Sequence, residues 1–283
     1  MALIDLANPA RFLAFTARAL PWLALATAVV FAVGLYLVWF VAPDDYQQGA
    51  TVKIMFIHVP NAWLSMAVWG VMSIASIGTL VWRHPLADVA AKSAAPIGAA
   101  FTFLALLTGS LWGRPMWGTY WVWDARLTSV LVLFLMYLGV IALWRTVDDP
   151  SRAARAAAIL TLVGAINLPI IKFSVDWWNT LHQPASVMKL GGPAIHPSIL
   201  TLVGALNLPI IKFSVDWWNT LHQPASVLRL GGSRLHPTLL VPLLVMVLAF
   251  TLLFFTLHLA AMRNEILRRR VRAMWLMQAH AAS

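Results

Sequence analysis

Histidine residues in two kinds of segment are the side chains best suited to hold a metal. His58 lies in KIMFIHVPNAW, just before an apolar run, and His182 lies in DWWNTLHQP, just after another. The second segment occurs twice, so His222 repeats His182. A lone histidine of this kind is usually a hydrogen-bonded structural residue. Two on the same side of a membrane, flanking a tryptophan-rich segment, favour paired axial ligation of a haem iron through imidazole nitrogen.

The tryptophan-rich segment is Gly113–Arg126, GRPMWGTYWVWDAR, with Trp112 directly before it. It is too polar and too broken by glycine and proline to span a membrane, yet too apolar to stay in water. One interpretation is an aromatic belt at the lipid headgroups, but belts distribute their tryptophans over all helix ends. We favour a platform at the outer surface whose flat faces contact a flat apolar ligand. Its aromatic members are Trp112, Trp117, Tyr120, Trp121 and Trp123.

Charged residues bracket this platform. Arg114 and Arg126 have the charge to hold the two propionates of a haem through charge-assisted hydrogen bonds. Contact with lipid phosphate is an equally good interpretation of the two arginines. Asp124 is expected either to pair with one of them or to cap a helix that starts near Leu127.

The elements that position these residues must be membrane helices. Of the 283 residues, 61% are hydrophobic and 11% are charged, and the mean hydropathy is +0.79. This composition excludes a soluble enzyme and predicts an all-α integral membrane protein that forms a single polytopic domain, residues 1–283. Six uncharged runs are the expected spans: Trp22–Pro43, Ala62–Trp82, Ser93–Trp112, Leu127–Trp144, Ala156–Ile171 and Thr238–Leu257. The fifth is short and contains Pro169.

The basic residues predict the orientation. The net charge is +10, but the arginines and lysines occur as short clusters between apolar runs, which argues against nucleic-acid binding. The positive-inside rule places these clusters, and both termini, in the cytoplasm. The tryptophan-rich segment then lies outside. The chain has no cysteine, which excludes thiolate metal sites and thioether attachment of haem to this chain.

Residues 160–199 and 200–239 form a tandem duplication. Both copies contain LTLVGA, NLPIIKFSVDWWNTLHQPASV, LGG and HP. If both copies crossed the membrane, there would be seven spans, and the arginines that follow the last span would lie outside. We therefore expect one copy not to cross, and the shorter second run, Ser198–Ile211, is the better candidate. This favours His182 as the second ligand, with His222 as the alternative.

The motifs of common membrane enzymes are missing. The sequence has no phosphate-binding loop for ATP hydrolysis, no H-E-x-x-H and no G-x-S-x-G. We expect the chain not to be an enzyme.

The segment 112–129, WGRPMWGTYWVWDARLTS, resembles the "WWD" signature of haem-handling membrane proteins. APDDYQQG, HVPNAW and NLPIIKFSVDWWNTLHQ extend the resemblance to the heme exporter protein C family, a haem-handling component of bacterial cytochrome c maturation. The resemblance implies a multi-pass protein of the bacterial inner membrane. It also implies two periplasmic haem ligands, His58 and the histidine of WWNTLHQ, and a periplasmic WWD segment. The implied partners are ABC-type subunits, a small membrane subunit and a periplasmic haem chaperone.

Two functions remain open at this point. In the first, the protein binds haem b as cargo at the outer face and delivers it to the chaperone. In the second, it is a haem-containing redox protein that exchanges electrons with quinone. The first requires both ligands at one membrane surface, whereas the second requires ligands within the spans.

Overall fold

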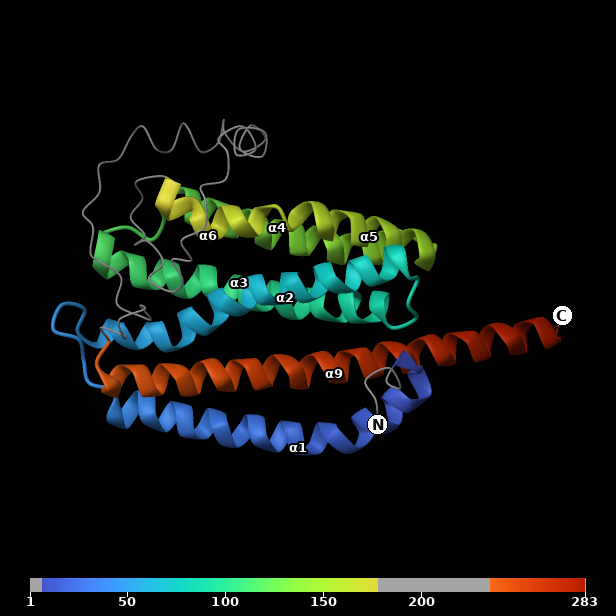
Figure 1. Ribbon diagram of the computed structural model, residues 1–283, viewed down its shortest axis with the longest axis horizontal. Coiled ribbons are helices and arrows are strands. Elements are labelled where there is room, and N and C mark those ends of the chain that lie inside the picture. The colour runs from blue at the N-terminus through green and yellow to red at the C-terminus, as the bar shows by residue number, and fades with distance from the viewer. Residues whose placement is uncertain (1–6, 178–234, 283) are drawn as a thin grey trace.

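Long antiparallel helices make up the protein (Figure 1). The computed structural model describes residues 7–177 and 235–282, which contain no β-strand beyond an isolated bridge between Asp45 and Gly49. The helices are α1 (Pro9–Tyr36), α2 (Met55–Val81), α3 (Ala87–Trp117), α4 (Ala125–Thr146), α5 (Pro150–Gly164), α6 (Asn167–Trp177) and α9 (Pro237–Ala282), with a π-turn at Leu37–Val41 and a 3₁₀ turn at Ala50–Ile54.

Within these ranges, six helical segments are long and apolar enough to cross a membrane, which confirms the predicted all-α membrane fold. The segments are Pro9–Val41, Ala50–Val81, Ala87–Trp117, Ala125–Thr146, Pro150–Ser174 and Pro237–Ala279. Most of the tandem duplication, with His182 and His222, lies outside the described residues. The prediction that one copy does not cross therefore stays a prediction.

Local sequence signals explain where several helices begin. The side-chain oxygens of Asn8, Asp124 and Asp149 accept hydrogen bonds from backbone N–H groups in the first turns of α1, α4 and α5. Such bonds satisfy donors that have no partner inside the helix. The Asp124 Oδ1 to Leu127 N distance is 2.6 Å, so the capping role expected for Asp124 is confirmed.

The fifth span is made of two helices rather than one. The α5 helix ends at Gly164 and α6 begins at Asn167, two residues before Pro169. The Asn167 side chain is buried and donates from Nδ2 to the carbonyl oxygen of Ser129 on α4, at 2.8 Å. This bond gives the buried amide of Asn167 a partner and ties the start of α6 to α4.

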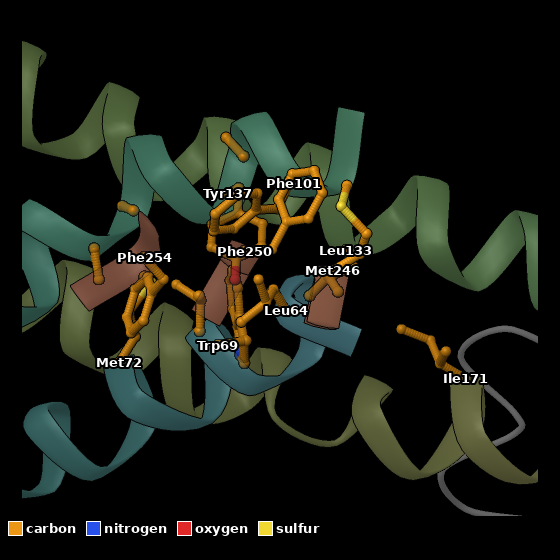
Figure 2. Close-up of a cluster of buried hydrophobic side chains, with 14 of the residues drawn as sticks. Leu64, Trp69, Met72, Phe101, Leu133, Tyr137, Ile171, Met246, Phe250 and Phe254 are labelled. Carbon is orange, nitrogen blue, oxygen red and sulfur yellow. The ribbon is translucent and has the colours of Figure 1, made fainter. Parts of the chain in front are cut away.

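A buried aromatic pair joins α2, α4 and α5 at the centre of the bundle (Figure 2). The rings of Trp69 and Tyr137 meet edge to face, with centroids 4.7 Å apart. Trp69 Nε1 donates to the carbonyl of Thr161 at 3.0 Å, and Tyr137 Oη donates to the carbonyl of Ser65 at 2.8 Å. Gly98 brings α3 into the same cluster, because its backbone lies directly against the Tyr137 ring.

Ion pairs hold α3 and α9 together at the end of the bundle where both termini lie (Figure 1). The Lys92 Nζ to Glu265 Oε1 distance is 2.7 Å, and Arg269 Nη1 lies 2.7 Å from Asp88 Oδ2. Arg269 also bonds to Glu265 at 3.0 Å. Because Glu265 is buried against two cations, its contacts fix the position of α9 relative to α3.

Candidate functional site

Three segments that the sequence separates meet at the opposite end of the bundle. They are the connection from Ala42 to Gly49, the first turns of α2, and the end of α3 with the turn that leads into α4. Two side-chain hydrogen bonds join them, one from His58 to Thr108 and one from Trp112 to Gln48. This end therefore brings His58 and the aromatic segment together, as the sequence predicts.

The position of the His58 imidazole is set by α3. Its Nδ1 lies 3.1 Å from Oγ1 of Thr108. The Thr108 hydroxyl hydrogen already points to the carbonyl of Leu104, at 2.6 Å, so the hydroxyl accepts from the ring. This arrangement favours the tautomer with its proton on Nδ1, the form in which Nε2 of a histidine can ligate a metal.

Gly109 gives the imidazole the space to lie against α3. A Cβ atom at Gly109 would come within 3.0 Å of His58 Cε1 and 3.5 Å of Nδ1. Any larger residue would push the ring away from Thr108. Thr108 therefore sets the direction of the His58 ring, and Gly109 sets how closely the ring approaches α3.

The aromatic segment begins inside a helix, because α3 continues past Trp112, where the third expected span ends. The α3 helix continues through Pro115 to Trp117, and Gly118 ends it with φ +76° and a bond from its N–H to the carbonyl of Arg114. A proline is tolerated here because it falls in the last turns, where the carbonyl that it leaves unpaired is near the helix end. Only Gly118–Asp124 is non-helical.

Paired indoles build the platform. Trp112 and Trp117 meet edge to face at 5.2 Å, and Trp121 and Trp123 do so at 5.5 Å. The Trp123 and Tyr120 side chains are 52% and 56% exposed, so their surfaces are open to a ligand. Among the described residues, the buried Nε1–H of Trp121 has no hydrogen-bond acceptor.

Both arginines of the segment make contacts within the chain. Arg114 donates to the carbonyl of Gly118, and its guanidinium carbon lies 5.5 Å from the centroid of the Tyr120 ring. Arg126 donates from Nη2 to the carbonyl of Lys172 at 3.2 Å, which ties α4 to α6. The proposed contact of these arginines with propionates stays a prediction.

Gln48 is a site residue that sequence reasoning missed. Its Oε1 accepts from Trp112 Nε1 at 2.9 Å. Asp45 shapes the surrounding loop by accepting from the backbone N–H groups of Gln47 and Gln48, both at 2.9 Å, and Gly49 adopts φ +56°. The motif APDDYQQG was the available signal, but only the fold shows that Gln48 orients an indole.

The other described histidines do not join this site. His84 lies in the connection between α2 and α3, at the opposite end of the bundle, where it accepts from the N–H of Leu86. His236 bonds to Thr238 at the start of α9. His258 is buried in α9 and stacked on Phe254, about 32 Å along the helix from Pro237. The second predicted ligand, His182 or His222, lies outside the described residues.

The chain matches known proteins over nearly its whole length. The family model described as Heme exporter protein C matches residues 2–201 and 196–277. Heme exporter protein C of Bradyrhizobium diazoefficiens is 72% identical over 279 residues, which cover 99% of this chain and 90% of the relative. The protein of that name from Escherichia coli K12 is 53% identical over 185 residues, covering 65% of this chain and 76% of the relative. In Paracoccus denitrificans the identity is 46% over 194 residues, 68% of this chain and 80% of the relative. The chain therefore belongs to the heme exporter protein C family.

Proposed function

We propose that this protein handles haem for the maturation of c-type cytochromes. It binds haem b as cargo at the periplasmic face of the bacterial inner membrane and presents it to a periplasmic haem chaperone. It works with ABC-type subunits and a small membrane subunit and does not itself catalyse a covalent step. Support comes from the family membership and from relatives named heme exporter protein C.

The observation that carries the proposal is the environment of His58. Its Nδ1 lies 3.1 Å from the Thr108 hydroxyl oxygen, which orients the ring on α3, and imidazole nitrogen is a common axial ligand of haem iron. The aromatic turn follows on the same helix, with Trp112 about one helical turn beyond Gly109. A nitrogen ligand of fixed direction beside flat apolar rings is what an iron porphyrin requires.

The rest of the platform fits the other features of haem. Indole faces suit the porphyrin ring, and the buried N–H of Trp121 would find an acceptor in a propionate. Arg114 and Arg126 supply positive charge at the two ends of the segment. His182 supplies the second axial nitrogen in this proposal, with His222 as its alternative.

Haem retention after purification tests the ligands. His58→Ala should lose haem, whereas His84→Ala, at the opposite end of the bundle, should retain it. Comparing His182→Ala, His222→Ala and the double variant identifies the second ligand. Full retention in both His58→Ala and the double variant would overturn the proposed ligation.

The platform requires its own test. Changing Trp117, Trp121 and Trp123 together to Ala should abolish retention without affecting membrane insertion. Stoichiometric haem in that variant would show that these indoles form an aromatic belt instead.

A transfer assay separates cargo delivery from electron transfer. Haem-loaded protein in proteoliposomes should pass its haem to an added apo-chaperone, detected by the absorbance of the separated chaperone. Reduction of the haem by a quinol, with no transfer, would instead support the redox alternative.

A further inference from the structure

The last helix extends well beyond the membrane-sized part of the bundle. It has 46 residues and is about 69 Å long, whereas α3 has 31 residues and is about 46 Å long, close to the full thickness of a bilayer with its headgroups. The Asp88–Arg269 ion pair places Arg269 level with the start of α3. Arg270–Ala282 therefore extends about 20 Å into water, and Figure 1 shows this end projecting past the other helices.

This extension carries an apolar stripe. Val271, Met274 and Trp275 of the extension, together with Leu267 just before it, follow the spacing i, i+4, i+7 and i+8, which puts them on one face of the helix. Their exposed fractions are 40%, 46%, 50% and 70%. Side chains exposed to this extent are ordinary where a span faces lipid, but beyond the headgroups they face water. Such a stripe marks a surface that another molecule covers.

The charge around the stripe selects the kind of partner. Arg270 and Arg272 are exposed in the extension, and Arg268 is exposed just before it. No Asp or Glu occurs after Glu265. Pairing of two such extensions would bring two arginine clusters together without a carboxylate between them, so a symmetric contact between two copies through this helix is disfavoured. The straight course of the helix carries the stripe away from the lipid surface.

We propose that the last turns of α9, Leu267–Ala279, dock into a protein groove with an apolar floor and a rim of Asp and Glu side chains. The stripe fills the floor, and Arg268 and Arg272 pair with the rim, the usual arrangement when an amphipathic helix binds in a groove. The inference rests on the proposed orientation for its location in the cytoplasm. It does not depend on haem ligation.

Because the chain has no cysteine, the reactivity of a single introduced cysteine shows whether a partner covers that position of the helix. Gln278→Cys places a thiol on the striped face while Trp275 stays intact, and Ala273→Cys places one roughly 140° away around the axis. The measurement is the rate of labelling by a membrane-impermeant maleimide in inside-out native vesicles. Labelling at position 278 should be about tenfold slower than at 273, because the docked partner covers the thiol.

Two variants in the Gln278→Cys background give the matched control. Trp275→Ala should restore fast labelling, whereas Leu276→Ala, a change at an exposed apolar residue about 100° away around the helix axis, should not. High salt or the pair Arg268→Gln and Arg272→Gln should also restore it, because both weaken pairing with carboxylates. Haem retention should be unchanged in all these variants, which separates this inference from the proposed haem site.

Three results would overturn the proposal. Equal labelling at 273 and 278 in native vesicles would mean that nothing covers the stripe. Protection in vesicles that contain only the purified protein and phosphatidylglycerol would identify lipid as the occupant. Disulfide cross-linking between two chains of the purified Gln278→Cys variant would identify a second copy.

Discussion

Replacing Thr108 with valine should weaken haem binding even though the residue contacts His58 and not the iron. Valine keeps the branched shape of threonine but removes the oxygen that lies 3.1 Å from His58 Nδ1. The imidazole then has no acceptor on α3 to select the tautomer with its proton on Nδ1. It also becomes free to rotate away from the direction that suits ligation.

The structure sets the size of this effect. Removing the hydrogen-bond partner of a ligating histidine typically lowers metal affinity by about 10- to 100-fold, or roughly 1.4 to 2.7 kcal/mol. The 3.1 Å distance is at the long end of the range for N–H···O bonds. His58 is also only partly buried, so water can replace some of the lost bond. We therefore expect a loss near the lower limit, about tenfold.

A titration of purified apoprotein with haem, followed by absorbance, measures this affinity. Thr102→Val is the matched control, since Thr102 is buried on the same helix and its hydroxyl bonds only to the Gly98 carbonyl of its own turn, at 2.7 Å. Thr108→Ser keeps the hydroxyl and should restore the affinity. Wild-type affinity in Thr108→Val would refute the reasoning. An equal loss of affinity in Thr108→Val and Thr102→Val would also refute it, because it would indicate a general packing defect.

Three further changes have defined outcomes. Gly109→Ala should reduce haem retention, because the added methyl group would lie 3.0 Å from the His58 imidazole. The control is Gly70→Ala, where an added methyl group would have no atom within 4 Å, and this variant should retain haem. Equal retention in the two variants would refute the steric argument. Gln48→Leu should weaken haem binding by removing an indole's acceptor, a net loss of about 1 kcal/mol, and Gln48→Glu should preserve it; the comparison is the haem titration. Glu265→Ala should lower the Tm in detergent, because Lys92 and Arg269 lose their buried partner. Arg152→Ala breaks an exposed ion pair and should change the stability by less than about 1 kcal/mol. Similar Tm values for the two variants would contradict this prediction.

The sequence predicts the number and class of the membrane-sized helical segments found in the described residues, but not their lengths. Hydropathy locates Thr238–Leu257, whereas α9 runs from Pro237 to Ala282. Its additional turns contain arginines and Glu265, which lower hydropathy without preventing helix formation. Charged residues continue a helix when they have partners, and Glu265 pairs with Lys92, 173 positions away. A hydropathy window contains no information about such a partner.

The same limit separates the site residues that were predicted from those that were not. His58 and the tryptophans stand out by residue type, because imidazole and indole are unusual in a membrane scaffold. Thr108 and Gly109 are ordinary residues of an apolar helix. Their role arises from a contact with His58 across 50 positions, which depends on how α2 packs against α3.

That packing connects the core to the site. The direction of the imidazole depends on the register of two helices, and a site of this kind works only when the supporting structure holds it within a fraction of an ångström. The Tyr137 ring lies against Gly98 of α3 and bonds through its hydroxyl to Ser65 of α2, so one side chain of α4 locks both helices. Thr108 lies ten residues, or about 15 Å, along α3 from Gly98. Because the helix is rigid, the position that Tyr137 fixes at Gly98 also fixes the position of Thr108. The buried aromatic core therefore helps to orient the imidazole of His58.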